Sequence, residues 1–215
     1  MRIIEDKSPG HLFTLKYSQP EDYHFCLDSI LTPKFVAETF SLPDQATVLD
    51  LCAGCGVIGF EYLFQNQEEL KKIKKVAFIE KQIEFQLHYN LNRNLFAEKC
   101  KSDLQFEWIS QSLSGDLELK EQFDLILCNP PYFFADEGKV PPNHFKAECH
   151  FFISLNPEIL LRSVLKLLKS NGAAFILVKK PDKWQNAFEA LKNDICHQKV
   201  AMIRGTLLVK VQKIA

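Results

Sequence analysis

The sequence predicts an α/β fold in which helices cover both faces of one mostly parallel sheet. Short apolar runs alternate along the chain with segments of helical periodicity, and the last two runs, 197–203 and 206–214, are separated only by Arg204-Gly205. Alternating strands and helices are typical of a parallel sheet, whereas a two-residue link joins antiparallel strands in a hairpin. The chain is therefore expected to end in an antiparallel pair.

Five further strands are expected upstream of this hairpin, because five short apolar runs fit buried strands in length and composition. They cover residues 46–52, 75–80, 104–109, 123–129 and 173–178. Together with the hairpin they make a sheet of seven strands, and helices are expected in the segments between them.

One expected helix follows the second run. Its apolar residues recur at four-residue spacing, which is typical of the core-facing stripe of an amphipathic helix. The stripe consists of Ile83, Leu87, Leu91 and Leu95. A further helix is expected near 182–193, ahead of the closing hairpin.

Capping signals mark two more helices. Asn156 can cap one of them, Pro157 suits its first turn, and Asn171-Gly172 marks its end. Near the amino terminus, Thr32-Pro33 can open another helix, because proline fits the first helical turn.

Composition is that of an ordinary globular domain. The chain has 215 residues, of which 47% are apolar and 25% charged, and a formal net charge of −1. A nucleic-acid partner is therefore expected only through a local basic patch. No linker interrupts the chain, so residues 1–45 are expected to cap the same domain that residues 46–215 build.

The cysteines indicate a reducing compartment. There are seven of them, an odd number, and several lie in apolar runs, as buried reduced thiols do. Cys52 and Cys55 form a lone C-x-x-C pair with no second pair at zinc-site spacing, so no metal is expected. With neither a signal peptide nor a run long enough to cross a bilayer, we expect a cytoplasmic protein without a membrane partner.

A glycine-rich turn follows the first core strand. Gly54, Gly56 and Gly59 have the spacing Gly-x-Gly-x-x-Gly, which lets the backbone approach a ligand closely. The turn lies at the carboxyl end of a predicted parallel strand, where open sheets bind their ligands. A dinucleotide and other adenosine cofactors suit such a turn equally.

Two carboxylates discriminate between these cofactors. Glu80 ends the second strand and can accept hydrogen bonds from the hydroxyls of an adenosine ribose. Asp50 stands four residues before Gly54, where it would repel a pyrophosphate and attract the sulfonium and ammonium groups of S-adenosylmethionine. The pair favours S-adenosylmethionine, and a nicotinamide-dependent oxidoreductase stays open as the less favoured alternative.

The fourth strand ends in Asn129-Pro130-Pro131-Tyr132. Two successive prolines remove backbone donors and stiffen the chain, which leaves the carbonyls of Asn129 and Pro130 free to face a ligand. These carbonyls can hold the hydrogens of a substrate amino group and stabilise the positive charge that grows on its nitrogen during methyl transfer. Because Tyr132 offers a flat face for stacking a base, we predict Asn129, Pro130 and Tyr132 as the catalytic residues.

The segments VLDLCAGCG, VAFIE and FDLILCNPPY, in that order, resemble those of class I S-adenosylmethionine-dependent methyltransferases with an NPPY motif. The resemblance implies a Rossmann-like fold with a seven-stranded, mostly parallel sheet whose last strand is antiparallel, and it makes residues 46–215 the methyltransferase domain. Within this family the chain is most similar to bacterial tRNA adenine-N6 methyltransferases, through NPPYFF and YHFCLDSIL (23–31).

The resemblance also implies roles for individual residues. The implied cofactor-binding residues are Asp28, Asp50, Gly54, Gly56, Glu80 and Asn129. Asn129 and Tyr132 are implied to position the target amine.

Two departures from the family concern the cofactor. Cys52 stands where the family has glycine, and its side chain can narrow the methionine pocket, so a catalytically silent RNA-binding module also stays open. Ser110 and Gln111 stand where the family has an acid that binds the adenine amino group. Either can accept that bond through an oxygen.

Adenine, guanine and a glutamine side chain all offer an amino group that suits the motif. RNA adenine is favoured, because an RNA loop presents unstacked bases without duplex opening, and tRNA is the expected partner. Guanine N2 of ribosomal RNA and a protein glutamine stay open, and the sequence gives no oligomeric state. Beside Tyr132, we expect Phe133, Phe134 and Lys180 to contact the substrate.

Other lysines divide between the two edges of the sheet. Lys139 and Lys146 follow the NPPY motif and can contact phosphate together with Lys180, although a solvated charged edge is the alternative for each. The cluster that precedes the second strand is expected at the opposite edge, where it only solubilises the protein. It consists of Lys71, Lys72, Lys74 and Lys75.

Overall fold

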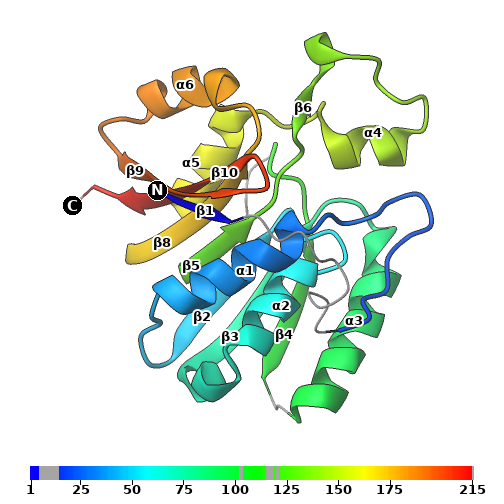
Figure 1. Ribbon diagram of the computed structural model, residues 1–215, viewed down its shortest axis with the longest axis vertical. Helices are drawn as coiled ribbons and strands as arrows, with labels where there is room; N and C mark the ends of the chain where they lie inside the picture. The colour runs from blue at the N-terminus through cyan, green and yellow to red at the C-terminus, as the bar shows by residue number, and fades with distance from the viewer. Residues whose placement is uncertain (5–14, 102–103, 115–118, 120–121, 215) are drawn as a thin grey trace.

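The computed structural model describes residues 1–4, 15–101, 104–114, 119 and 122–214. Within these residues the centre is an eight-stranded sheet with the order β1-β9-β10-β8-β5-β2-β3-β4 (Figure 1). Strand β10 runs antiparallel to both of its neighbours, and the other neighbouring strands are parallel. The predicted α/β fold with a closing antiparallel hairpin is therefore confirmed.

Seven of the eight strands coincide with the predicted apolar runs, and β1 was not expected. Its three residues pair in parallel with Ala201, Met202 and Ile203 of β9, so the extreme amino terminus extends the sheet beyond the hairpin. The strands are β1 (Arg2–Ile4), β2 (Ala46–Leu51), β3 (Ile73–Glu80), β4 (Gln105–Ser110), β5 (Phe123–Cys128), β8 (Leu168–Val178), β9 (Ile195–Ile203) and β10 (Thr206–Lys213).

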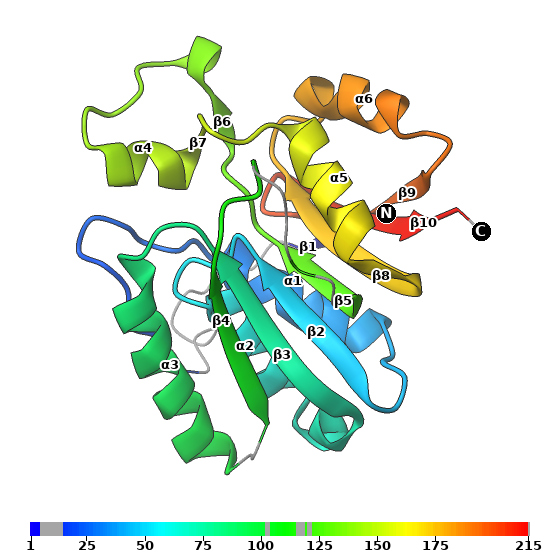
Figure 2. The same ribbon diagram turned by 180° about the vertical axis from the view of Figure 1, so that it is seen from behind.

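Helices cover the two faces of the sheet in separate groups. Alternate residues of one strand point to opposite faces, so that Val48 packs against the first group and Leu49 against the second. The first group consists of α1 (Asp28–Thr39), α2 (Val57–Gln65) and α3 (Phe85–Cys100) (Figure 1). The second group consists of α5 (Pro157–Leu167) and α6 (Pro181–Ala190) (Figure 2).

Shorter elements complete the described chain. A 3-10 helix, η2 (Gln67–Lys72), leads into β3, and a second one, η3 (Ala135–Glu137), follows β6. Beyond the carboxyl ends of the parallel strands stands a small projection (Figures 1 and 2). Its parts are β6 (Phe133–Phe134), α4 (His144–His150) and β7 (Phe151–Phe152), and its two short strands pair in parallel.

The apolar stripe predicted for α3 is wrong as a core face except at Leu95, which is partly buried and packs against the first core. Ile83, Leu87 and Leu91 are exposed, Leu87 by 65%. The helix instead buries a face that carries Phe85, Tyr89 and Phe96, whose rings lie against Phe60, Phe78 or neighbouring aromatic residues of the core. Both faces have helical periodicity, and the aromatic one was buried because it removes more apolar area from water.

Two predicted helix boundaries are also wrong. Helix α5 keeps its predicted start, where the side chain of Asn156 accepts a hydrogen bond from the N–H of Ile159, but it ends at Leu167 rather than at Asn171-Gly172. The latter pair lies inside β8. Helix α1 begins at Asp28, so Pro33 lies inside the helix instead of opening it.

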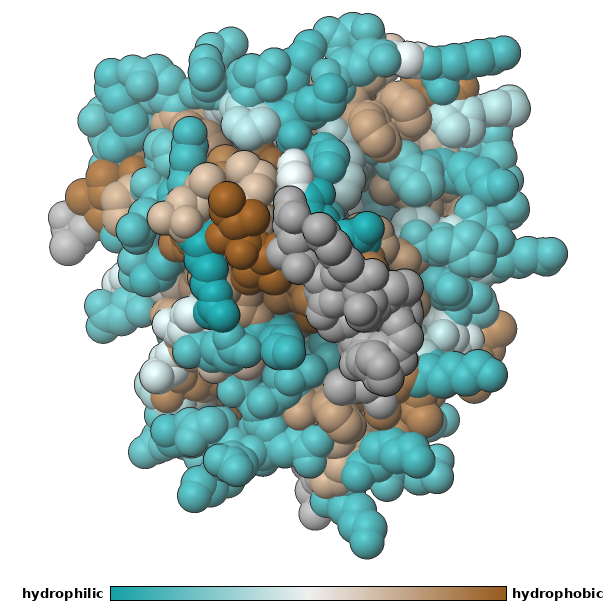
Figure 3. Space-filling model, viewed as in Figure 1, coloured by the Kyte–Doolittle hydropathy of each residue, from teal (hydrophilic) through white to brown (hydrophobic). Residues whose placement is uncertain are grey.

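The described surface is that of an ordinary globular protein. Figure 3 shows one face that is largely hydrophilic, with hydrophobic residues gathered only in small patches. Among the helices of the described residues, none is both long and apolar enough to cross a membrane.

Gly172 explains why the chain continues as a strand past the end of α5. A Cβ at this position would lie 2.8 Å from the carbonyl oxygen of Phe123 and 3.0 Å from that of Asp124, so only glycine lets β8 approach β5 this closely. We expect Gly172→Ala to lower the free energy of unfolding by about 1–3 kcal/mol, as measured by urea denaturation. Gly138→Ala is the matched control, because nothing lies within 4 Å of its added Cβ, and equal losses in the two variants would contradict this account.

Candidate active site

The candidate site lies where the strand order of the sheet reverses. The chain proceeds from β2 outward to β3 and β4, and β5 then begins the other half on the far side of β2. Open α/β sheets bind ligands at such switch points, beyond the carboxyl ends of the strands. A cavity lies there, and among the residues that line it are five of the predicted site residues: Cys52, Gly54, Glu80, Gln111 and Asn129.

Two left-handed glycines lie in the turn that connects β2 to α2. Gly54 has a φ of 53° and Gly56 a φ of 78°, a conformation that glycine adopts without steric cost. A Cβ on Gly56 would also lie 2.8 Å from the ring of Phe60. The turn therefore holds the start of α2 tightly against the sheet and presents the Gly54 backbone to the cavity.

Two buried carboxylates hold this turn. Glu80 accepts hydrogen bonds from the N–H groups of Gly54 and Gln82, both at 2.9 Å, and Asp50 accepts one from Gly59 in the first turn of α2, also at 2.9 Å. Burial raises the pKa of both carboxyls, although the backbone N–H groups oppose the rise. Asp50 Oδ1 is buried and has no hydrogen-bond partner within the described structure.

Cys52 lies between these groups in a conformation that suits glycine. Its φ is 58°, which is strained for a residue with a Cβ, and its side chain lines the cavity. A glycine at this position would adopt the same conformation without that strain. Within the described residues, no three His, Cys, Asp or Glu side chains form a group that could hold a metal ion, and this includes Cys52 and Cys55.

Asn129 follows β5 and faces the same cavity. Its Nδ2 donates a hydrogen bond to Ser29 Oγ at 3.2 Å. Its Oδ1 is buried and has no hydrogen-bond partner in the described structure. A buried carbonyl without a partner is costly, so this oxygen is well placed to accept a donor from a ligand.

Hydrogen bonds fix both the side chain and the backbone of Tyr132. Its hydroxyl donates to Asp28 Oδ2 at 3.0 Å, and its N–H donates to the carbonyl of His150 at 3.0 Å. Burial, reinforced by Cys26 and Asp28, raises the pKa of the phenol well above its ordinary value. The hydroxyl therefore stays protonated and acts as a donor.

Asp28 does not line the cavity, in contrast to the implied cofactor-binding role. Its carboxylate is 5% exposed and accepts hydrogen bonds from Tyr132 and from Thr206 Oγ1, the latter at 2.9 Å. Through the first of these bonds, Asp28 contacts the NPPY motif. Its implied role in cofactor binding stays a prediction.

The residues after Tyr132 separate into different environments. Phe133 is 38% exposed and lies beside Phe151 with ring centroids 5.7 Å apart. Phe134 instead stacks on Phe152 at 4.9 Å and packs against the second core, while its predicted substrate contact stays a prediction. Lys180 forms an ion pair with Glu137 at 3.3 Å.

Ser110 is set apart from the other predicted cofactor residues. It ends β4, pairs with Glu80 in the sheet and does not line the cavity, whereas the next residue, Gln111, does. Cavity residues that sequence reasoning missed include Lys81, Glu148 and Ser154, which contact one another. Only Lys81 had a usable signal, because it directly follows Glu80.

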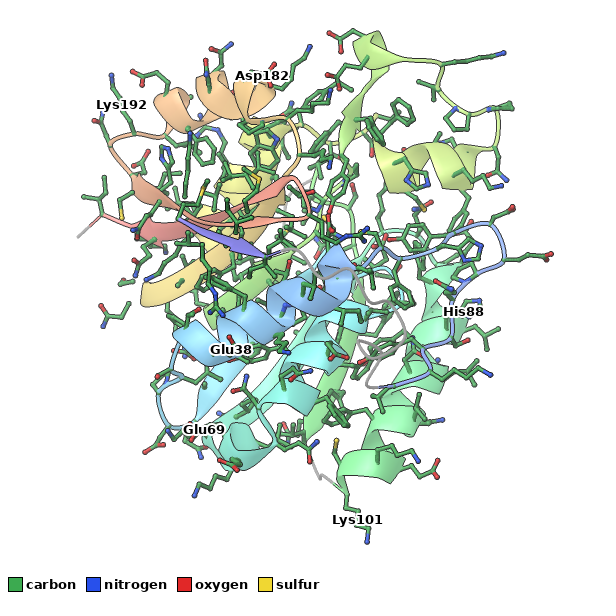
Figure 4. All side chains as sticks on the ribbon, in the orientation of Figure 1. Glu38, Glu69, His88, Lys101, Asp182 and Lys192 are labelled. Atoms are coloured by element: carbon green, nitrogen blue, oxygen red, sulfur yellow. The ribbon has the colours of Figure 1, made fainter. Side chains whose placement is uncertain are left out.

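The predicted lysine cluster lies away from the site, with Lys71 and Lys72 at the end of η2 and Lys74 and Lys75 in β3. Lys72 pairs with Glu69 at 2.5 Å, and Lys75 pairs with Glu107 at 2.7 Å. Figure 4 labels Glu69 and Lys101 at the end of the sheet where β3 and β4 begin, opposite the projection formed by β6, α4 and β7. The cluster is therefore remote from the site, as expected, although half of it belongs to β3 and not to the turn before that strand.

The raised pKa of Asp50 predicts how stability depends on pH. Burial holds this pKa above the ordinary value of 3.8, so the folded state favours the protonated group, and the stability from it is lost as pH rises through the folded pKa. We expect Asp50→Asn to unfold at higher urea concentration than the unsubstituted protein at pH 7, without added ligand. The difference should shrink towards pH 4.

Asp124→Asn is a control of opposite sign. Burial acts to raise the Asp124 pKa, but hydrogen bonds from Lys169 and Thr47 lower it overall. Its contribution to stability is present above the unfolded pKa and is lost as pH falls, so this variant should be less stable than the unsubstituted protein at pH 7. A stabilisation by Asp50→Asn that is identical at pH 4 and pH 7 would contradict the assignment.

Known proteins resemble this chain in sequence and in structure. The tRNA1(Val) (adenine(37)-N6)-methyltransferase of Shewanella woodyi is 25% identical over 193 residues, which cover 81% of this chain and 74% of the relative. The enzyme of the same name from Escherichia fergusonii is 27% identical over 146 residues, which cover 66% of this chain and 54% of the relative. The match thus spans little more than half the length of the second relative.

Solved structures share the fold. SMU.776 complexed with SAH superposes with a TM-score of 0.60 at 12% sequence identity, over 88% of this chain and 50% of that one. The model of the methyltransferase small domain family matches residues 29–201, which include the glycine turn, both carboxylates and the NPPY motif. Family and fold together indicate S-adenosylmethionine as the cofactor. This chain therefore belongs to the methyltransferase small domain family and is an S-adenosylmethionine-dependent methyltransferase.

Proposed function

We propose that this protein transfers a methyl group to an exocyclic amine of RNA, namely N6 of an adenine in tRNA. The observation that carries the proposal is the buried Asn129 Oδ1, which has no hydrogen-bond partner in the described structure and belongs to a residue that lines the cavity beside the glycine turn. The names of the relatives, tRNA adenine-N6 methyltransferases, support the same substrate class.

The chemistry follows from the acceptor groups of the motif. When bound, S-adenosylmethionine supplies an electrophilic methyl group. Asn129 Oδ1 and the carbonyl of Pro130 would accept the two hydrogens of the target amine and so direct its nitrogen lone pair into the cavity. Positive charge grows on that nitrogen during transfer, and carbonyl dipoles fixed in advance stabilise it. Tyr132 would stack on the base.

The cavity has groups that fit this cofactor. Glu80 accepts hydrogen bonds from two backbone N–H groups. Each of its carboxylate oxygens has a further lone pair that can accept a ribose hydroxyl. Asp50 lies behind the glycine turn, where a bound cation would favour its ionised form and a pyrophosphate would oppose it. Gln111 lines the cavity beside Glu80 and can accept from the adenine amino group.

We propose that RNA is held mainly by shape and stacking around the motif. Several lysines near it already carry acidic partners: Lys146 pairs with Asp22 at 2.8 Å, and Lys180 pairs with Glu137. Phosphates would have to displace these carboxylates. The predicted local basic patch therefore stays a prediction, with Lys139 as its best candidate member because it is exposed beside the motif.

Guanine and glutamine remain alternative substrates with the same amine chemistry.

That residues 1–45 cap the same domain also stays a prediction. The packing of α1 on the first core and the pairing of β1 with β9 support it. All seven cysteines are free thiols, which supports the predicted cytoplasmic location.

The first experiment supplies the purified protein with isotopically labelled S-adenosylmethionine and total RNA from a strain that lacks it. We expect label in N6-methyladenosine after digestion and mass spectrometry. Asn129→Ala should lower this transfer at least ~100-fold, while the calorimetric affinity for S-adenosylhomocysteine stays close to that of the unsubstituted protein. Label in N2-methylguanosine would replace adenine with guanine as the substrate, and no label in RNA would turn the test to protein glutamine. Full activity of Asn129→Ala would exclude the mechanism.

The strained Cys52 gives a second prediction. Cys52→Gly removes both the left-handed strain and the side chain that lines the cavity, so we expect a gain in unfolding free energy of about 1 kcal/mol together with tighter binding of S-adenosylhomocysteine. Cys52→Ala is the matched control, because it removes the thiol but keeps the Cβ and therefore the strain. Equal stability of the two variants would show that the backbone conformation carries no cost.

A further inference from the structure

We propose that Asp28 and Ser29, the first two residues of α1, are positioning residues for the NPPY motif, each acting on one of its two functional side chains. The inference rests on the proposed function, because it assigns these residues a role in the transfer to an amine. Neither the glycine turn nor the NPPY sequence itself contains them, and the structure brings them to the motif from about one hundred residues upstream.

Ser29 anchors the Asn129 amide through a hydrogen bond to one of its ends. Its side chain is buried, with the residue 3% exposed, and its Oγ accepts the hydrogen bond from Asn129 Nδ2 at 3.2 Å. This bond engages the NH₂ end of the amide and leaves Oδ1 without a partner. A reversed amide would point its own N–H donors at the target amine, and two donors cannot bond to each other.

Asp28 fixes the position of the Tyr132 ring. The carboxylate accepts the phenol hydroxyl at 3.0 Å, and a hydrogen bond to an ionised acceptor is stronger than one between neutral groups. The same oxygen accepts Thr206 Oγ1 at 2.9 Å. Because Thr206 is fully buried at the start of β10, the closing hairpin holds Asp28 in place.

The support of Asp28 and Ser29 is itself rigid. Helix α1 buries Ile30, Leu31, Phe35 and Val36 in the first core. Helix α2, which begins at the glycine turn, packs in the same core. The two first-turn residues of α1 therefore connect the motif that would hold the amine to the helix that starts at the cofactor turn. A shift of α1 would move both functional side chains together.

Kinetic constants distinguish a positioning role of these two residues from a role in folding alone. We expect Ser29→Ala and Asp28→Ala each to lower kcat for methyl transfer about tenfold, with the KM for RNA and the affinity for S-adenosylhomocysteine nearly unchanged. Asp28→Asn should recover most of the kcat, because an amide oxygen can accept the same two hydroxyls. In a Tyr132→Phe background, Asp28→Ala should lower kcat little further, because the hydroxyl that Asp28 binds is already absent.

Two control variants remove comparable groups elsewhere. Ser163→Ala deletes a buried serine hydroxyl that donates to the Ile159 carbonyl within α5 at 2.9 Å, and Asp124→Asn alters a carboxylate that binds Thr47 and Lys169. Both should keep the kcat even where their melting temperatures fall.

The outcomes distinguish this inference from the proposed function. No transfer to RNA by the unsubstituted protein would overturn the proposed function and, with it, a part for Asp28 and Ser29 in that transfer. An active unsubstituted protein whose Ser29→Ala and Asp28→Ala variants keep their kcat would overturn the inference alone. The role of Asp28 would also be overturned if the effects of Asp28→Ala and Tyr132→Phe simply multiply, because the acid would then not act through the phenol.

Discussion

The whole site depends on the burial of two carboxylates at the ends of neighbouring strands. Asp50 and Glu80 give up their hydration and accept backbone N–H groups of the turn and of the helix start instead. Such bonds compensate the burial only in part, since the pKa of each acid stays raised. The burial of these two carboxylates is therefore not fully compensated within the protein. A cationic or hydroxyl-bearing ligand would supply the missing interactions.

Much of the fold could be predicted from sequence because buried parallel strands are continuous apolar runs, which local composition alone identifies. The errors fall where a second element decides the outcome. In the sequence, Gly172 has the pattern of a helix terminator. In the fold, β5 lies so close to it that a side chain would not fit. The exposed Leu87 and the buried Tyr89 lie on two faces of one helix with equal periodicity, so the choice between them depended on the aromatic core opposite.

The site shows the same division. Its backbone frame follows from residues close together in sequence, such as Gly54 after Asp50, so spacing was sufficient to find it. The orientation of side chains does not follow, because it depends on hydrogen bonds between residues far apart. Asp28 illustrates this: the resemblance implied only a cofactor role for it, and its contact with Tyr132 became visible only in the structure.

A short motif can therefore supply the reactive groups without fixing the orientation of their side chains. The prolines restrict the backbone between Asn129 and Tyr132, but they leave the amide of one and the ring of the other free to rotate. Hydrogen bonds to α1 remove that freedom, and the buried Thr206 at the start of β10 secures the acid that makes one of them. Because preorganised dipoles stabilise a transition state only when they need not reorient, the amino-terminal helix and the closing hairpin are part of the catalytic apparatus although neither contains the motif.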